Sequence, residues 1–178
     1  DRASGLDSVL SMAALFVPED FVVPTRVERE GYVLRPLTTR DVDKDYEAVM
    51  SSRESLRHVF AEYDAEWPAD DMTLEDNYRD LARHQHDFET RSGFTYTMEV
   101  PDGSRCLGCV YIYPCHRGPY DARVHYWVRD REKAQGLEEA LGAFLHQWLA
   151  DVWPFRRPVF PGRDLSWQAW EALEETSR

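Results

Sequence analysis

Apolar residues recur at two spacings along the chain, and the shorter spacing predicts the strands. Alternation of apolar and polar side chains, or short runs of β-branched and aromatic residues, is typical of strands. This pattern covers Tyr32–Leu37, Phe94–Val100, Cys106–Cys115, Ala122–Val128 and Pro158–Phe160. A turn at Pro101–Ser104 joins the second and third of these segments, which predicts a β-hairpin.

The longer spacing, of three to four residues, predicts the helices. One helix begins near Asp41, and a second begins at Thr73, which can cap it together with Asp76. Leu137–Val152 carries a wide apolar stripe over four turns and predicts the longest helix. Two weaker patterns predict short helices at Val9–Val17 and Leu165–Leu173.

The order of these elements predicts an α/β fold in three layers, with a central mixed sheet flanked by helices. Antiparallel strands come first, and a β-α-β unit with parallel strands follows them. The 178 residues suit one domain. We place that domain at residues 26–178 and interpret residues 1–25 as an N-terminal extension.

The charge balance narrows the range of partners. The chain has 21 basic and 33 acidic residues, a net charge of -12, and no basic stripe. Nucleic acids and anionic membranes are therefore disfavoured, whereas a cationic small molecule or a basic protein surface is favoured. The apolar stretch Val9–Val17 is too short to span a membrane and does not resemble a signal peptide, so we expect a cytoplasmic protein.

The three cysteines do not indicate a disulfide framework or a metal site. Cys106 and Cys109 lie three residues apart in a predicted strand, where such residues point to opposite faces. A second cysteine pair, which would complete a structural zinc site, is missing from the sequence. We therefore expect these side chains to pack in the sheet, and we expect no metal.

Three segments carry a resemblance to a known family. They are Tyr32–Leu37 followed by Asp41, the strand Leu107–Tyr113, and the strand-turn-helix stretch Val124–Ala150. With these features the chain resembles the GNAT superfamily of N-acetyltransferases, as a divergent member. The resemblance implies a pyrophosphate-binding turn at Arg131–Gly136, where Ala134 replaces the first glycine of the family pattern.

The resemblance also implies the chemistry. Acetyl-CoA would be the acyl donor, and a small-molecule or protein amine, which can be cationic, would be the acceptor in a ternary complex. The implied donor-binding residues are Trp127, Val128, Arg131, Ala134, Gln135, Gly136 and Leu137. A backbone N–H near Trp127 or Val128 would stabilise the developing oxyanion.

The acid–base residues are less clear from the sequence. In the family a tyrosine on the last helix often protonates the departing thiolate, but the last helix here has tryptophans instead. We take His125 and Tyr126 as the candidate catalytic residues, His125 because an imidazole ordinarily titrates near neutral pH. An ordinary structural role in the strand is the alternative for both.

Two other functions stay open. Ala134, the neighbouring glutamates and the absent tyrosine also fit a non-catalytic binding or oligomer-forming module, a homodimer included. The third hypothesis is a cleft that holds a different, cationic ligand among the tryptophans of the C-terminal half.

Overall fold

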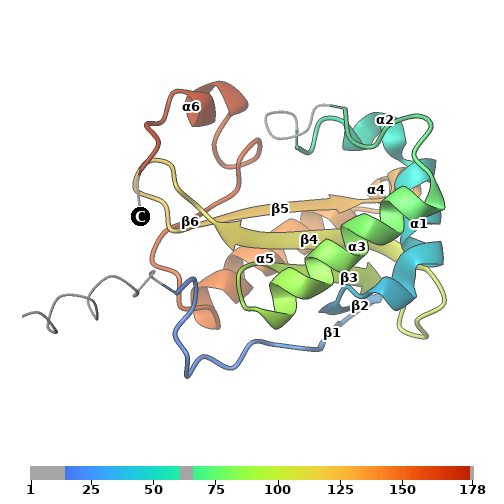
Figure 1. Cartoon of the computed structure of the whole chain (residues 1–178), viewed down its shortest axis with the longest axis horizontal. Coiled ribbons are helices and arrows are strands. Elements are labelled where there is room, and N and C mark those ends of the chain that lie inside the picture. The colour runs from blue at the N-terminus through green and yellow to red at the C-terminus, as the bar shows by residue number, and fades with distance from the viewer. Residues whose placement is uncertain (1–14, 61–65, 177–178) are drawn as a thin grey trace, which may run out of the picture.

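A six-stranded mixed sheet forms the centre of the protein (Figure 1). The computed structural model describes residues 15–60 and 66–176. Strands β1 to β5 are antiparallel neighbours in chain order, and β6 pairs with β5 in parallel. The strands are β1 (Val27–Arg29), β2 (Tyr32–Pro36), β3 (Phe94–Glu99), β4 (Cys106–Pro114), β5 (Ala122–Val128) and β6 (Pro158–Val159). The mixed sheet and its hairpin confirm the predicted fold class.

Helices cover both faces of this sheet, as predicted. The 3-10 turn η1 (Thr39–Asp41), α1 (Val42–Ser51), α2 (Arg53–Leu56) and α3 (Leu74–Glu89) precede β3. The others are α4 (Asp130–Lys133), α5 (Leu137–Asp151) and α6 (Trp167–Glu171). Figure 1 shows α1 and α3 on one face and α5 on the other.

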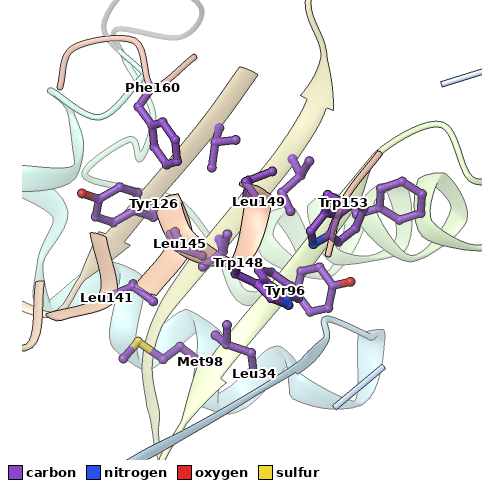
Figure 2. Packing of buried hydrophobic residues seen from close by; sticks show 14 of the residues in the cluster. Leu34, Tyr96, Met98, Tyr126, Leu141, Leu145, Trp148, Leu149, Trp153 and Phe160 are labelled. Carbon is purple, nitrogen blue, oxygen red and sulfur yellow. The ribbon is translucent and has the colours of Figure 1, made fainter. Parts of the chain in front are cut away.

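The larger apolar core lies under α5. Leu141, Leu145 and Trp148 of this helix pack against Tyr96 and Met98 of β3, and Figure 2 shows their side chains interdigitating. A second core lies under α1 and α3, where Val49 and Leu81 meet Tyr111 and Trp127. Because β5 contributes alternate side chains to the two sides of the sheet, both of its faces are buried.

Local signals set the helix ends close to where the sequence predicts them. The Thr73 hydroxyl accepts a hydrogen bond from the Asp76 N–H at 3.1 Å, and the Asp76 carboxylate accepts one from the Thr73 N–H at 3.0 Å. This reciprocal cap is the predicted capping box. The Ser166 hydroxyl accepts a single capping hydrogen bond, from the Ala169 N–H at 3.1 Å, so α6 begins at Trp167, two residues after the predicted start.

A bulge at the start of β4 overturns one prediction. Glu99 pairs with Cys106 and Met98 with Gly108, so Leu107 is an extra residue in the strand. The alternation shifts by one there, and Cys106 and Cys109 face the same core, under α1 and α3. The prediction that they point to opposite faces was wrong, because it assumed an unbroken period of two.

The described part of the N-terminal segment packs on the domain. Val17 is buried in the larger core, and the Phe16 ring lies 5.0 Å from that of Phe155. Most of the predicted helix Val9–Val17 lies outside the described residues. Among the described helices, none has the length and apolar character needed to cross a membrane.

Candidate functional site

The edge of β5 that faces β6 is open over most of its length. In the part of the chain that the structure describes, β6 pairs only with Ala122 and Arg123, at the start of β5. The remainder of the strand, from Val124 to Val128, runs past the end of β6. This edge therefore presents backbone groups that a bound molecule can pair with.

Arg163 occupies part of this edge. Its guanidinium donates to the Tyr126 carbonyl at 2.7 Å, lies 3.6 Å from the centre of the Tyr126 ring and pairs with Glu138 at 3.0 Å. Glu138 belongs to the first turn of α5. Arg163 thus joins the strand edge to the beginning of the long helix.

The direction of the Tyr126 carbonyl also fixes which N–H groups face the open edge. In a strand, the N–H and C=O of one residue point to the same side, and those of the next residue point to the other. The N–H groups of Tyr126 and Val128 therefore face the open edge. The Arg129 N–H donates to the Leu107 carbonyl of the neighbouring chain segment at 2.9 Å, so Trp127, two residues before Arg129, also has its N–H facing β4. Of the two predicted oxyanion donors, only Val128 has its N–H at the open edge.

The predicted pyrophosphate turn lies between β5 and α5. Its first three residues, 131–133, belong to α4, in which the N–H groups of Glu132 and Lys133 donate to the Arg129 carbonyl at 2.9 and 3.2 Å. Gly136 follows in a left-handed conformation, with φ at 76°, and precedes α5. The first hydrogen bond of α5 joins the Ala140 N–H to the Gly136 carbonyl at 3.1 Å. The preceding N–H groups, from Leu137 to Glu139, remain available to an anion.

The predicted donor-binding residues fall into two groups. Arg131, Ala134, Gln135 and Gly136 are exposed on the turn, and Leu137 is half-buried. Trp127 and Val128 are buried on opposite faces of β5 and serve the two cores. The side chain of Trp127 donates to the Tyr111 hydroxyl at 2.9 Å.

Arg129 holds the turn in place, a role that the sequence analysis missed. Its guanidinium forms a bidentate pair with Glu47 of α1, one bond being 2.6 Å, and donates to the Cys106 carbonyl at 3.2 Å. Glu132 in α4 pairs with Arg105 at 2.7 Å. These contacts anchor the turn to α1 and to the bulged end of β4.

His125 and Tyr126, the two candidate catalytic residues, lie on opposite faces of β5. The Tyr126 side chain faces α5, where a Cβ atom added to Gly142 would lie 2.4 Å from its hydroxyl. Burial raises the pKa of Tyr126, and Arg163 opposes that rise. His125 faces the other way, between Phe60 and Trp167.

The environment of His125 contradicts the expectation that it titrates near neutral pH. Burial, together with the charges of Arg123 and Arg163, lowers the pKa of His125 to about 3. Its Nε2 lies 3.4 Å from Nη1 of Arg123, and the ring hydrogen-bonds to the Val59 backbone. The imidazole is therefore neutral at physiological pH.

Two cavities meet at His125. The edge cavity, of about 220 Å³, lies along the open edge of β5 and is lined by Tyr126, Lys133, Glu138, Arg163 and Trp167 as well as His125. The helix-side cavity, of about 270 Å³, lies between α3 and strands β4 and β5. His125 lines both of them, so it forms part of the wall between them.

The helix-side cavity contains two polar residues that the sequence analysis missed. Asp45 is 3% exposed, and its carboxylate accepts hydrogen bonds from the Asn77 amide at 2.9 Å and the Cys109 thiol at 3.4 Å. Burial raises the pKa of Asp45 to about 6. Both residues lie on the apolar stripes of their helices, Asp45 between Val42 and Val49, and a polar residue on such a stripe was the available signal.

A third polar group in this cavity is the half-buried His84 of α3. Its Nδ1 lies 3.0 Å from the Thr95 hydroxyl and 2.9 Å from the Tyr113 hydroxyl. Burial lowers the pKa of His84 to about 4, so this imidazole is also neutral at physiological pH. The cavity therefore combines an acid, neutral imidazoles and aromatic hydroxyls.

The chain belongs to the GNAT acetyltransferase family. The family model of the acetyltransferase (GNAT) domain matches residues 32–172, which includes the whole sheet except β1 and all the described helices. A comparison with curated proteins finds no match.

Solved structures of acetyltransferases share the fold. The ribosomal-protein-S5-alanine acetyltransferase of Vibrio fischeri has a TM-score of 0.56 and 16% identity, over 71% of this chain and 67% of its own. RimL, a ribosomal L7/L12 alpha-N-protein acetyltransferase, has a TM-score of 0.58 and 15% identity, over 81% and 75%. The microcin C7 self-immunity acetyltransferase MccE, in complex with acetyl-CoA and AMP, has a TM-score of 0.58 and 14% identity, over 78% and 73%. At these identities the likeness shows the fold.

Proposed function

We propose that this chain transfers an acetyl group from acetyl-CoA to an amine, with both substrates bound at once. The observation that carries the proposal is the meeting of two cavities at His125, one of which runs along an open strand edge beside the start of α5. The edge cavity suits the donor and the helix-side cavity suits the acceptor.

The donor is held by backbone groups and by helix α5. Its pyrophosphate lies at the N–H groups of Leu137 to Glu139, where the helix dipole favours negative charge. Lys133 lines the same cavity and adds a positive charge. The thioester carbonyl accepts a hydrogen bond from the N–H of Val128 at the open edge, which stabilises the oxyanion formed during attack.

The two candidate catalytic residues then serve different substrates. The amine nitrogen attacks the thioester carbon, the new C–N bond replaces the C–S bond, and the nitrogen loses one proton while the sulfur gains one. Tyr126, which lines only the edge cavity of the two, is placed to return a proton to the thiolate. His125, neutral and in the shared wall, orients the incoming amine.

The N-terminal turn of α5 gives the proposal a direct test. Gly136→Val places a β-branched residue at φ 76°, and we expect at least tenfold weaker binding of acetyl-CoA in isothermal titration, because the strained turn re-aims the N–H groups. Gly31→Val is a matched control. Gly31 has φ 87°, and like Gly136 it has no heavy atom within 4 Å of an added Cβ. Equal affinity of the Gly136 variant and the wild type would contradict the phosphate cradle.

A non-catalytic binding module is the second candidate, and one observation favours it. The N–H groups of Glu132 and Lys133 already donate to the Arg129 carbonyl inside α4. This part of the turn therefore has fewer free donors for a phosphate than the sequence pattern predicts. Binding of acetyl-CoA at micromolar concentration, followed by transfer to an amine, would exclude the non-catalytic module. No detectable binding would favour it.

A further inference from the structure

The helix-side cavity contains a carboxylate that no cation balances. Asp45 lines this cavity and is buried, and within residues 15–60 and 66–176 its carboxylate accepts hydrogen bonds only from the neutral groups of Asn77 and Cys109. Among the residues that the structure describes, no ion pair includes Asp45, and the charges acting on it, those of Asp41 and Asp80, are negative. A buried carboxylate without a counter-ion is costly, and function is a common reason to keep one.

The basic residues of the same cavity already have other partners. Arg83 pairs with Asp80 at 3.2 Å and is 65% exposed, so it lies toward solvent. Arg123 donates to the Pro114 carbonyl at 3.3 Å and lies 5.4 Å from the centre of the Tyr113 ring. Neither interaction joins an arginine to Asp45, so the Asp45 end of the cavity stays anionic when Asp45 is ionised, while Arg123 lies at the His125 end.

Aromatic side chains line the space beside this carboxylate. The Phe60 ring meets the edges of Trp67 and Tyr111, with centroids at 5.5 and 5.0 Å. All three residues line the cavity together with Asp45. Aromatic faces attract organic cations, and an alkyl chain packs well against them. The cavity therefore suits an alkylammonium group.

The distance from Asp45 to the open strand edge determines how far apart two amino groups of a ligand must be. Asp45 contacts Cys109 of β4, whereas the donor edge lies on the far side of β5. Two strand spacings separate these places, about 10 Å. An ammonium held by Asp45 keeps its proton and cannot reach a thioester at that edge. The attacking nitrogen must be a second one, at the His125 end of the cavity.

We propose that the acceptor is an elongated aliphatic diamine, with one ammonium group on Asp45 and the other nitrogen, as the free amine, beside His125. This inference rests on the proposed acetyl transfer and names the acceptor for it. Asp45 is then the specificity-determining residue of the acceptor cavity. It does not take part in the exchange of bonds.

Acetyl-transfer kinetics with paired substrates test the proposal. We expect 1,5-diaminopentane to exceed 1-aminopentane in kcat/KM by at least tenfold, because only the diamine engages Asp45. In Asp45→Asn the KM for the diamine should rise at least tenfold and the tenfold preference for the diamine over the monoamine should be lost. The exposed Glu89→Gln on α3 should keep the preference of the wild type. Equal use of both amines by the wild type would overturn the proposal.

A binding measurement separates this inference from the proposed function. Titration with 1,5-diaminopentane in the absence of acetyl-CoA should show binding to the wild type and at least tenfold weaker binding to Asp45→Asn. Such binding without any acetyl transfer would support the Asp45 site and contradict the transferase. Acetyl transfer to monoamines, with no binding of the diamine, would contradict the Asp45 site and leave the transferase standing.

Discussion

The carboxylate of Asp45 carries its charge at a cost to the folded state. Its side chain is fully buried, and its pKa rises from 3.8 to about 6. A group whose pKa is higher in the folded protein favours folding at low pH, and that contribution is lost as the pH rises through the folded pKa. The shift corresponds to about 3 kcal/mol of stability that is missing at neutral pH.

Removal of this charge should therefore stabilise the protein, and only at neutral pH. We expect Asp45→Asn to raise the free energy of unfolding in urea by about 2–3 kcal/mol at pH 7.5, with little gain at pH 4, where the carboxyl group is protonated in the fold. The exposed Glu89→Gln should change it by less than about 0.5 kcal/mol. An equal gain at both pH values would show that the charge of Asp45 is not the cause.

The candidate residues differ in how far the sequence could predict them. His125 and Tyr126 follow from a recognisable strand, and their opposite faces follow from its alternation. Asp45 and Asn77 come from two separate helices and meet Cys109 only after both pack on the sheet. The sequence places polar residues on two apolar stripes, but it cannot show that the stripes face each other. The shifted pKa values of these residues cannot be predicted from the sequence either, because they depend on burial.

At the scale of elements, the strand pattern predicts the hairpin but not its register. Cys106–Tyr113 is apolar at every position except Gly108, so alternation does not mark which side chains face which layer. The bulge at Leu107 therefore leaves no trace in the apolar pattern, although it decides that Cys109 meets Asp45. The longer helices are easier to predict, because α3 begins with a capping box and α5 carries a wide apolar stripe. The single turns α2 and α4 are too short for a periodic signal.

Gly108 is the residue that the bulge requires. An added Cβ would lie 2.1 Å from the Trp127 carbonyl oxygen and 3.2 Å from the Val128 Cα, both of them backbone atoms of β5 that cannot move aside. We expect Gly108→Ala to lower the free energy of unfolding in urea by about 3 kcal/mol or more. Gly31→Ala, which meets no neighbour, should cost about 1 kcal/mol through its positive φ alone. Equal costs for the two variants would contradict the close approach of β4 and β5.

At the scale of the whole molecule, β5 divides the two halves of the proposed reaction. Its Tyr126 face meets α5 and the edge cavity, and its His125 face meets the helix-side cavity, where α1 and α3 contribute Asp45 and His84. The net charge of -12 favours a cationic acceptor over an anionic one. Three titratable groups of the helix-side cavity, Asp45, His84 and His125, also make the stability of the whole fold depend on pH.

The three groups affect the pH dependence of the free energy of unfolding with different signs, and their net effect can be measured. The pKa values of His84 and His125 fall from 6.5 to about 4 and about 3, so both residues gain a proton on unfolding between about pH 6 and pH 4.5. Asp45, with its pKa raised to about 6, loses one on unfolding in the same range. Unfolding then takes up one net proton, and stability should fall by about 1.4 kcal/mol for each pH unit of acidification.

Urea unfolding at several pH values measures this slope. The window lies above the ordinary pKa values of exposed carboxyl groups, which contribute at lower pH. In His84→Gln, the proton that His125 gains on unfolding and the proton that Asp45 loses cancel. The free energy of unfolding of this variant should therefore be nearly constant between pH 6 and pH 4.5. Such a variant can still hydrogen-bond with Thr95 or Tyr113, the partners of His84. A wild-type stability that stays constant on acidification would mean that one of the two histidines is already protonated in the fold, and a charged His125 would not orient a neutral amine.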